Sequence, residues 1–487
     1  MAEYQVPLKD MNFLLYDVFK ADQMWANIPE LAENIEPETA DAILQECAKI
    51  AEQVIAPLSR EGDEVGVSWD NGNVTTAPGF VDAFKTYAEG GWVGLGGDLE
   101  YGGMGMPKML TALQEEILCG ADIAFALYPS LTSGACLSLA KHGSEELKEK
   151  YLPNMYAGEW AGTMCLTEAH AGTDLGLIRT KAIANENGSY NITGSKIFIT
   201  GGEHDLTDNI VHLVLAKLPD APEGSRGISL FLVPKIKVND DGSLGERNGI
   251  SCGSIEHKMG INASATCVLN FDDAEGFLVG ELNKGLACMF TMMNYERIGV
   301  GIQGLGAGVR SYQNALEYAK DRLQSRSLSG KKSPEKPADS LMVHGDVRRM
   351  LLNMKALNEG NRALALYISK QLDLSKYASG EEQVKGEALT ALMTPLAKAF
   401  FTDIGLENTV AGQQVFGGHG YIREWGQEQL VRDVRIAQIY EGTNGVQAMD
   451  LIGRKLVANK GLFMDYFISE VKAYIADNQS NEMAEFI

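Results

Sequence analysis

The spacing of apolar residues changes twice along this chain of 487 residues, and that double change limits the folds that the chain can adopt. Apolar residues first recur every three or four positions, which predicts amphipathic helices at 40–55, 80–89 and 108–119. The spacing then shortens towards two, which predicts strands at 192–200, 210–218, 228–238 and 265–271. Helical spacing returns from Gly285 onward, interrupted by polar segments at 329–340 and 375–383. This block order predicts an α+β fold and not a doubly wound fold, in which strands and helices alternate.

The two changes divide the chain into an N-terminal extension and three predicted domains. We expect an N-terminal α-helical domain, a middle β-barrel or β-sandwich domain and a C-terminal α-helical bundle. The predicted boundaries are 1–37, 38–162, 163–283 and 284–487.

The segment 299–304, GVGIQG, matches the glycine pattern of a nucleotide-binding loop. That pattern indicates a dinucleotide site only where it follows a strand, and the residues before it have helical spacing. Gly301, Gly304 and Gly308 then fall on one face of a helix. Because each glycine costs a helix about 1 kcal/mol relative to alanine, we expect close helix packing as compensation. A nicotinamide-dependent dehydrogenase that uses this segment is the alternative from another enzyme class.

Charge and targeting signals exclude several kinds of partner. The net charge of −23 argues against nucleic acid and anionic membranes as partners. The first residues do not form a signal peptide and there is no run of 18 apolar residues, so we expect a cytoplasmic protein without stable membrane insertion. The seven cysteines and seven histidines are scattered without a CxxC or HExxH motif, so we expect neither a disulfide framework nor a metal site.

The segment Tyr440-Glu441-Gly442-Thr443 places a carboxylate between an aromatic ring and a Gly-Thr bend. The residues before it, 430–438, have helical spacing, and Gly442 is an expected helix stop. A carboxylate in an apolar, aromatic setting has its charged form disfavoured, which raises its pKa and suits it to act as a general base. Taken alone, such a glutamate is more often a surface residue near a helix end.

Two segments of the β region combine hydroxyl groups with glycines or an aromatic ring. Thr167 and Thr173 lie in TEAHAGTD, which suits a polar ring edge or a carbonyl and equally suits a plain connecting loop. Phe198 and Thr200 are expected on one face of a strand, with Ile199 on the other face. An aromatic plane beside a hydroxyl would suit a planar heterocyclic cofactor, although core packing explains the phenylalanine equally well.

The last region contains residue types that bind phosphate groups. Arg322 closes a predicted helix, and Arg432 lies on the helix before Glu441. Arginine suits pyrophosphate, and a double glycine, as in QVFGGHGY (414–421), lets backbone N–H groups approach it.

Taken together, these motifs resemble the acyl-CoA dehydrogenase flavoprotein family. TEAHAGTD, GSKIFITGG, ERIGVGIQGLG, AKDR, GQQVFGGHGY and RDVRIAQIYEGT occur in the order and spacing of that family, and the resemblance covers nearly the whole chain. The segments VPLKDMNFLL, GISLFLVPK and SIEHKMGI look closest to the longer bacterial members, which are similar to fatty acyl-CoA or 3-methylthiopropanoyl-CoA dehydrogenases. Those members continue beyond the equivalent of Ile487, so a truncated or naturally short C-terminus is expected.

The resemblance implies FAD as the cofactor and an acyl-CoA as the substrate, which would be converted to the trans-2-enoyl-CoA. Glu441 would remove the α-proton of the thioester while hydride passes from the β-carbon to flavin N5. The implied contacts to the flavin, its phosphates or its ring substituents are Met164, Leu166, Thr167, Thr173, Phe198, Thr200 and Thr443. The implied contacts to the FAD diphosphate and adenosine, made across a subunit interface of a homodimer or homotetramer, are Arg322, Gln414, Gly417 and Gly418. The implied substrate contacts are Thr173, Arg297, Tyr440 and Gly442.

A second carboxylate competes for the role of base. In part of the family the base stands at an ERL-like position on the glycine-rich helix, and the YEGT glutamate is then missing. This chain has both Glu296, at the first position, and Glu441, at the second. We expect Glu441 to be the base and Glu296 to pair with a neighbour such as Arg297.

The resemblance leaves the electron acceptor and the acyl group open. An electron-transfer flavoprotein would receive the electrons from a dehydrogenase, whereas oxygen would receive them from an acyl-CoA oxidase with the same base and flavin. A straight-chain, branched or sulfur-containing acyl group would be selected by the depth of a pocket between helices of the first and third regions.

Overall fold

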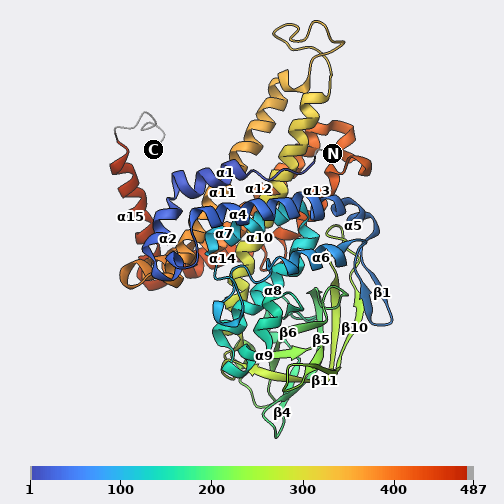
Figure 1. Ribbon diagram of the computed structural model, residues 1–487, viewed down its shortest axis with the longest axis vertical. Helices are drawn as coiled ribbons and strands as arrows, with labels where there is room; N and C mark the ends of the chain where they lie inside the picture. The colour runs from blue at the N-terminus through green and yellow to red at the C-terminus, as the bar shows by residue number, and fades with distance from the viewer. Residues whose placement is uncertain (1–2, 480–487) are drawn as a thin grey trace.

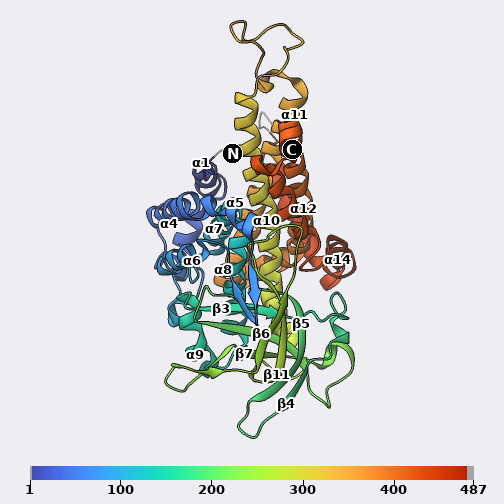
Figure 2. The ribbon, with the colours of Figure 1, turned by 90° about the vertical axis from the view of Figure 1, so that its right-hand side faces the viewer.

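Helices, strands and helices follow one another along the chain, in the order that the sequence predicts. The computed structural model describes residues 3–479. The strands gather at one end of an elongated molecule, and α10 runs from them towards the opposite tip (Figure 1). The same arrangement is visible from the side, where α10, α11 and α12 lie next to one another (Figure 2).

The N-terminal region is helical apart from one short hairpin. Its longer helices are α4 (Pro37–Ile50), α6 (Phe80–Glu89), α7 (Lys108–Ala121), α8 (Ile123–His142) and α9 (Glu145–Tyr156). Its shorter elements are α1 (Leu8–Asn12), α2 (Ala21–Asn27), α3 (Pro29–Ala32), α5 (Ser59–Val65), β1 (Ser68–Asp70) and β2 (Asn73–Thr75). The helices predicted at 80–89 and 108–119 are confirmed, and the one predicted at 40–55 continues from α4 through a π-helical turn.

Helix α8 passes through the interior and is therefore apolar around most of its circumference. The Asp122 carboxylate caps its first turn by accepting hydrogen bonds from the N–H groups of Ala124 and Phe125. Within residues 3–479, α8 is the one helix long and apolar enough to cross a membrane, although the sequence has no unbroken run of 18 apolar residues. In its most apolar window, 78% of the residues are buried inside the protein, and this burial accounts for its composition. The cytoplasmic location expected from the sequence stays a prediction.

Strands of the middle region close into a ring. β5 pairs with β4 and β11, β11 pairs with β7, β7 pairs with β6, and β6 returns to β4 through one residue pair. β3 lies parallel to β6, and β10 is added beyond β11. The ring confirms a β-barrel-like middle region. The strands of this sheet are β3 (Trp160–Cys165), β4 (Lys181–Ala184), β5 (Tyr190–Thr200), β6 (Asn209–Lys217), β7 (Ile228–Pro234), β10 (Ile250–Ile255) and β11 (Thr266–Val279). A separate pair consists of β8 (Ile236–Val238) and β9 (Leu244–Arg247).

The C-terminal region is a bundle of long helices. They are α10 (Gly285–Asp321), α11 (Gly345–Tyr377), α12 (Gly380–Phe416), α13 (Gln427–Arg435), α14 (Asn444–Asp450) and α15 (Leu462–Asp477). Both predicted interruptions are confirmed, because 329–340 lies in the loop between α10 and α11 and 375–383 contains the break between α11 and α12. The domain boundaries stay a prediction.

The glycines of GVGIQG lie inside α10 and allow neighbouring helices to approach it closely. A Cβ added at Gly304 would overlap the backbone oxygen of Phe401 on α12. On another side of the helix, a Cβ at Gly306 would lie 2.7 Å from Cβ of Cys119 on α7. The predicted helix packing is confirmed, and these buried glycines are not free to form a phosphate-binding loop.

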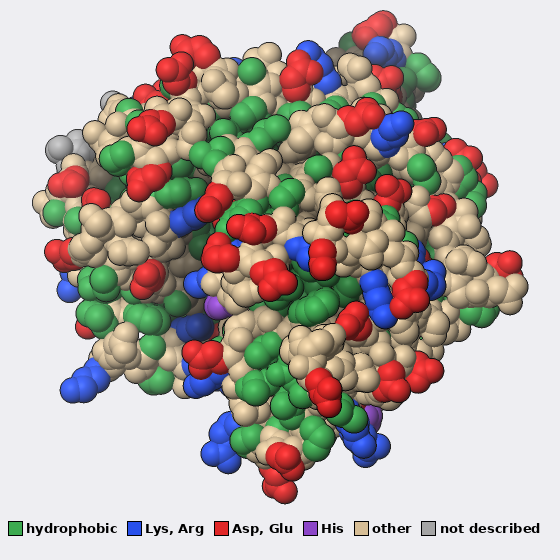
Figure 3. Space-filling view, turned by 60° about the horizontal axis from the view of Figure 1, so that its bottom comes forward, with side chains coloured by type: hydrophobic (Ala, Val, Ile, Leu, Met, Phe, Trp, Pro, Cys, Tyr) green, Lys and Arg blue, Asp and Glu red, His purple; other side chains and the backbone are tan. Residues whose placement is uncertain are grey.

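Charged groups of both signs are spread over the surface. In Figure 3, acidic and basic side chains alternate with exposed apolar groups. The excess of acids that gives the net charge of −23 is therefore not gathered into one patch on that face.

We predict that Gly304→Ala lowers the stability of the protein by about 1–3 kcal/mol, because the new methyl group must push α12 away from α10. Gly360→Ala is the matched control, since Gly360 lies in the exposed middle of α11 and an added Cβ would meet nothing within 4 Å. That control should gain up to about 1 kcal/mol from helix propensity. Thermal unfolding of both variants checks the prediction, and an unfolding temperature for Gly304→Ala at or above that of the unmodified protein would contradict it.

Candidate active site

Glu441 lies in a bend between two helical segments, as the sequence predicts. α13 is followed by a 3₁₀ turn, η10 (Ile436–Gln438), and α14 begins at Asn444. Glu441 has φ 54° and Gly442 has φ 80°, so two successive residues adopt the left-handed backbone region. Such a conformation is uncommon for a glutamate and is held in place by its surroundings.

Two side chains downstream of the bend hold it. The Thr443 hydroxyl caps α14 by accepting a hydrogen bond of 3.3 Å from the Val446 N–H. The Gln447 amide donates to the carbonyl oxygens of Glu441 and Gly442, at 3.2 and 3.1 Å. The direction of the Glu441 side chain is therefore set by its own backbone.

Burial and two nearby cations have opposite effects on the pKa of Glu441. Burial raises the pKa of Glu441 to about 7, while the positive charges of Arg297 and Lys398 act to lower it. This confirms the raised pKa that the sequence predicts. Burial also lowers the pKa of Lys398 to about 8, and the Glu441 charge opposes that shift.

Lys398 was not among the predicted site residues. It is fully buried on α12, and its Nζ donates to Oδ1 of Asn444 at 2.9 Å. Its sequence signal is a single lysine inside the apolar run LMTPLAKAFFT (392–402). A buried lysine needs a partner, and here the bend that carries Glu441 supplies it.

Glu296 faces α8 and does not pair with Arg297, so that expectation is wrong. Its Oε2 accepts a hydrogen bond from the Ser130 hydroxyl at 3.2 Å, and its Oε1 has no hydrogen-bond partner within the described part of the chain. Arg297 points to a different side of α10, because successive residues on a helix are roughly 100° apart. Its Nη2 lies beside the bend that carries Glu441, 3.9 Å from the place that a Cβ on Gly442 would take.

The carboxyl group of Glu296 is only 2% exposed. Burial, reinforced by the charges of Glu441 and Glu115, raises the pKa of Glu296 to about 8. The two carboxyl groups named as candidate bases therefore interact electrostatically, and Glu296 is the more strongly protonated of the two near neutral pH.

Two cavities adjoin these groups. One of about 30 Å³ lies between α7, α8 and α10, and it is lined by Glu115, Ser130 and Gln303 among others. Gln303 also accepts a hydrogen bond from the Tyr440 hydroxyl, which places this cavity beside the residue that precedes Glu441. The other, of about 860 Å³, lies between the N-terminal helices and α10 to α12 and reaches Arg297. Cavities between the first and third regions, where the sequence analysis places a pocket, are thus present.

Phe198 stands at a β-bulge on β5. Ile199 pairs with Cys267 but Lys196 pairs with Leu269, so β5 contains one residue more than its partner strand, and Phe198 has φ 60°. Strict alternation therefore fails here, because Lys196 and Ile199 are both buried although they are three positions apart. The Phe198 ring is 59% exposed, so it is not packed into the core.

The TEAHAGTD loop lies beside this bulge. The carbonyl oxygen of Thr167 accepts a hydrogen bond of 2.9 Å from the Ile197 N–H. Nζ of the buried Lys196 donates to the Leu166 carbonyl oxygen and to Glu168, both at 2.9 Å. Sequence reasoning missed this buried lysine–glutamate pair. It attaches the loop to β5 and so brings Thr167 next to Phe198.

The remaining residues predicted in the β region differ in their exposure. Met164 is partly buried on β3 and Leu166 is buried just after it, whereas Thr173 is exposed in the loop. Thr200 ends β5 opposite Thr266 on β11 and is partly buried.

Arg322 and the glycine pair lie together at the far end of the bundle. Tyr318, one turn before Arg322, stacks on Phe416 with ring centroids 4.1 Å apart, and its hydroxyl is 2.9 Å from Nδ1 of His419. Gly417 has φ 60°, and a Cβ on it would meet nothing within 4 Å. The exposed side chain of Gln414, the open backbone at Gly418 and the exposed Arg322 therefore border one surface.

The chain does not bring this surface to the rest of the candidate site. α10 has 37 residues and is therefore about 55 Å long. Its first residue packs against β7, Glu296 lies in its first half, and Arg322 follows its last residue. The residues around Glu441 and those around Arg322 are consequently separated by much of the length of the bundle within one chain.

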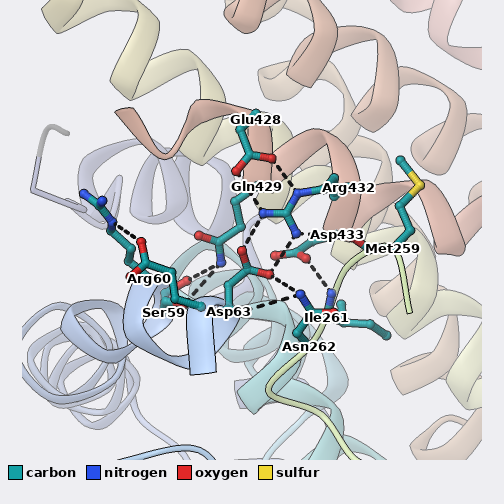
Figure 4. A network of polar contacts seen from close by, with 11 residues as sticks. Ser59, Arg60, Asp63, Met259, Ile261, Asn262, Glu428, Gln429, Arg432 and Asp433 are labelled. Atoms are coloured by element: carbon teal, nitrogen blue, oxygen red, sulfur yellow. Dashed lines mark hydrogen bonds and ion pairs between the residues drawn. The ribbon is translucent and has the colours of Figure 1, made fainter. Parts of the chain in front are cut away.

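Arg432 is engaged in a structural network and is not available for a pyrophosphate. Its guanidinium donates to Asp63 on α5, at 2.8 and 2.5 Å, and to Glu428 one turn earlier (Figure 4). The hydrogen bonds to these carboxylates raise its pKa. The adjacent Asp433 accepts a hydrogen bond of 2.5 Å from the Ile261 N–H. This network fixes α13, and through it the bend at Glu441, against the N-terminal helices.

Within residues 3–479, no group of three or more histidine, cysteine, aspartate or glutamate side chains could hold a metal ion, and all seven cysteines are buried thiols.

Three family models match the chain in sequence order. They describe the N-terminal domain of acyl-CoA dehydrogenase (residues 37–159), its middle domain (163–274) and its C-terminal domain (283–456). A solved structure of butyryl-CoA dehydrogenase from Megasphaera elsdenii superposes with a TM-score of 0.70, at 28% identity over 87% of this chain and 99% of that chain.

Curated relatives agree with these models. The 3-methylmercaptopropionyl-CoA dehydrogenase of Ruegeria pomeroyi is 44% identical over 94% of this chain and 77% of its own length. A butyryl-CoA dehydrogenase of Syntrophomonas wolfei is 40% identical over 91% of this chain and 74% of its own length. The broad-specificity linear acyl-CoA dehydrogenase FadE5 of Mycobacterium tuberculosis is 35% identical over 99% of this chain and 80% of its own length. The chain therefore belongs to the acyl-CoA dehydrogenase family of flavoprotein oxidoreductases.

Proposed function

We propose that this enzyme oxidises an acyl-CoA thioester to the trans-2-enoyl-CoA, with Glu441 as the base that removes the α-proton. The observation that carries the assignment is the state of Glu441, a carboxylate in a fixed bend whose pKa is raised to about 7. A base with a pKa near the working pH combines a useful ionised fraction with a strong affinity for the proton. Burial supplies that pKa.

Arg297 and Lys398 act on the base through their charge. Without them, burial alone would hold the proton on Glu441 at neutral pH. Lys398 is positioned by its hydrogen bond to Asn444, so the cation and the base are fixed by the same bend. We assign both residues to tuning the base, and Arg297, which lines the large cavity, also to substrate binding.

The residues of the β region fit FAD. An aromatic ring that is 59% exposed on a left-handed bulge has no structural explanation in core packing, and a flat heterocycle would cover it. We assign Phe198, Thr200, Thr167, Met164 and Leu166 to the flavin end and Thr173 to its phosphate side. FAD, when bound, supplies an acceptor for the hydride that leaves the β-carbon.

The FAD diphosphate and adenosine would be held by Arg322, Gln414, Gly417 and Gly418. An exposed arginine and a glycine pair with open backbone suit phosphate oxygens. Since one chain keeps this surface remote from Phe198, we propose that two chains complete each site in a homodimer or a dimer of dimers. The hydroxyl oxygen of Thr443 already accepts a hydrogen bond from the Val446 N–H, so its contact to FAD would be made by donating its own proton.

We further propose an electron-transfer flavoprotein as the electron acceptor. A similar solved structure, 28% identical over 87% of this chain with a TM-score of 0.71, comes from work on the electron transferring flavoprotein of Acidaminococcus fermentans. Reduction of that acceptor in a coupled assay, without peroxide in air, distinguishes a dehydrogenase from an oxidase.

Glu441→Gln should retain FAD but lose anaerobic bleaching of the flavin by acyl-CoA, with a fall in rate of roughly 10²–10⁴-fold, because an amide cannot take the proton. Glu296→Gln should still bleach, since Glu296 is protonated near neutral pH and is directed at Ser130. Stopped-flow absorbance of the flavin measures both variants. The reverse pattern would assign the base to Glu296.

The pH dependence of kcat/KM should show one limb near pH 7, with activity lost as the pH falls and Glu441 gains its proton. Lys398→Met removes a cation that lowers this pKa, so the limb should move to higher pH. Lys455→Met, near the same large cavity but not among the charges that shift Glu441, is the control. An unmoved limb in Lys398→Met would show that another group sets it.

Arg322→Glu should lose FAD, whereas Arg348→Glu, an exposed arginine of α11, should retain it. Chains with Arg322→Glu coexpressed with chains with Glu441→Gln should recover bleaching. A symmetric dimer formed at random would then have roughly a quarter of its sites with both unmodified residues. Absence of recovery, with mixed dimers demonstrated by two affinity tags, would place the whole site in one chain.

A further inference from the structure

The bend that carries Glu441 is attached to α12 at both of its ends by one carboxylate oxygen. Oδ1 of Asp403 accepts a hydrogen bond of 2.6 Å from Nε2 of Gln438, which precedes Glu441. The same oxygen accepts a hydrogen bond of 2.7 Å from Nδ2 of Asn444, which follows Glu441. Because a carboxylate oxygen has a lone pair for each donor, Asp403 holds the two ends of the segment 438–444 together against α12.

Asp403 also orients the side chain of Asn444. The two Nδ2 protons of Asn444 have two acceptors, Oδ1 of Asp403 and the Ala399 carbonyl oxygen at 3.2 Å. Oδ1 of Asn444, on the opposite side of the amide, accepts from Nζ of Lys398 at 2.9 Å. A reversed amide would place its oxygen against a carboxylate and its NH₂ group against an ammonium. Asp403 therefore keeps an acceptor in front of the buried Lys398.

The charges that face Lys398 and Glu441 come from α10, α12 and the bend. Burial lowers the pKa of Lys398 to about 8, and the negative charges of Glu441 and Asp403 oppose that shift. The positive charge of Arg297 on α10 acts in the same direction as burial. Glu296, also on α10, is protonated near neutral pH. The charges that lower the pKa of Glu441 are those of Arg297 and Lys398, so the charge of Asp403 reaches the base through Lys398.

We propose that Asp403 is a positioning residue for the base, because it holds the bend at both ends and keeps Lys398 charged beside Glu441. The inference rests on the proposed role of Glu441 and adds a residue that acts on it from the protein surface, where Asp403 is exposed. Asp403 needs no contact with the substrate or the flavin. It has two separable effects, one on the geometry of the bend and one on the charge of Lys398.

The charge effect is tested with Asp403→Asn, which keeps an oxygen for the two donors but removes the negative charge. Butyryl-CoA and octanoyl-CoA are the substrates, and anaerobic bleaching of the flavin is the assay. We expect the limb of kcat/KM near pH 7 to move to higher pH by roughly half a pH unit. The sign follows because a less positive Lys398 lets Glu441 keep its proton to a higher pH. The rate on the high-pH plateau should stay close to that of the unmodified enzyme.

The geometric effect is tested with Asp403→Ala, which removes both hydrogen bonds as well as the charge. The limb should move as in Asp403→Asn, and the plateau should also fall by about tenfold, because the bend is no longer held at its ends. Glu407→Ala is the matched control. Glu407 is an exposed carboxylate one turn later on α12, without a hydrogen bond or ion pair to any residue within 3–479. This control should leave both the limb and the plateau unchanged.

A double variant provides a measurement that a purely structural role would not affect. If Asp403 acts through Lys398, adding Asp403→Asn to Lys398→Met should move the limb no further than Lys398→Met alone. FAD content and thermal unfolding of each variant show how much of the enzyme is folded and loaded.

Three results would overturn the inference. A limb that stays in place in Asp403→Asn would mean that the charge does not reach the base. A fall in activity at every pH without movement of the limb in Asp403→Ala would mean that Asp403 supports only the fold. Equal movement of the limb with and without Lys398 would exclude the path through that lysine. Failure of the proposed function is distinct from all three, because then neither acyl-CoA would bleach the flavin of the unmodified enzyme.

Discussion

Close packing of α10 against α7 and α12 positions most of the chemical groups in this protein. The glycines of α10 allow that approach, and the helix carries Glu296, Arg297 and Gln303 in one half and ends at Arg322. α12 carries Lys398 in its interior and ends at the Gly417–Gly418 pair. The relative placement of the base, its cations and the predicted phosphate contacts therefore depends on one helix pair. A shift along that pair would move both ends of the site at once.

The pKa values of Glu441 and Glu296 depend on burial and on the charges of neighbouring groups. Burial alone would leave Glu441 and Glu296 both protonated, and the negative charge of Glu441 further disfavours the ionisation of Glu296. Two cations act on Glu441, whereas Glu296 has the neutral Ser130 as its hydrogen-bond partner. Because the bend brings Glu441 close to these two cations, Glu441 ionises at a lower pH than Glu296. Two glutamates that look equivalent in sequence thereby acquire different protonation near neutral pH.

Local patterns predicted the elements well and the contacts between them less well. Apolar spacing located the long helices, the strands and the interruptions, because these depend on which residues face the core. The raised pKa of Glu441 followed from its apolar and aromatic neighbours. The bulge at Phe198, the partner of Glu296 and the engagement of Arg432 by Asp63 were not predictable, because each depends on a residue brought from a distant segment. Lys398 and the Glu168–Lys196 pair were missed for the same reason.

The remoteness of Arg322 from Phe198 within one chain has a consequence for how the cofactor is retained. If each chain holds only part of a binding surface, the free energy of cofactor binding and that of subunit association are linked by mass action. Dilution would then weaken cofactor retention, and the cofactor would in turn stabilise the assembly by the same coupling free energy. A substitution in the α10–α12 packing could thus alter the flavin content of the enzyme without touching the flavin site.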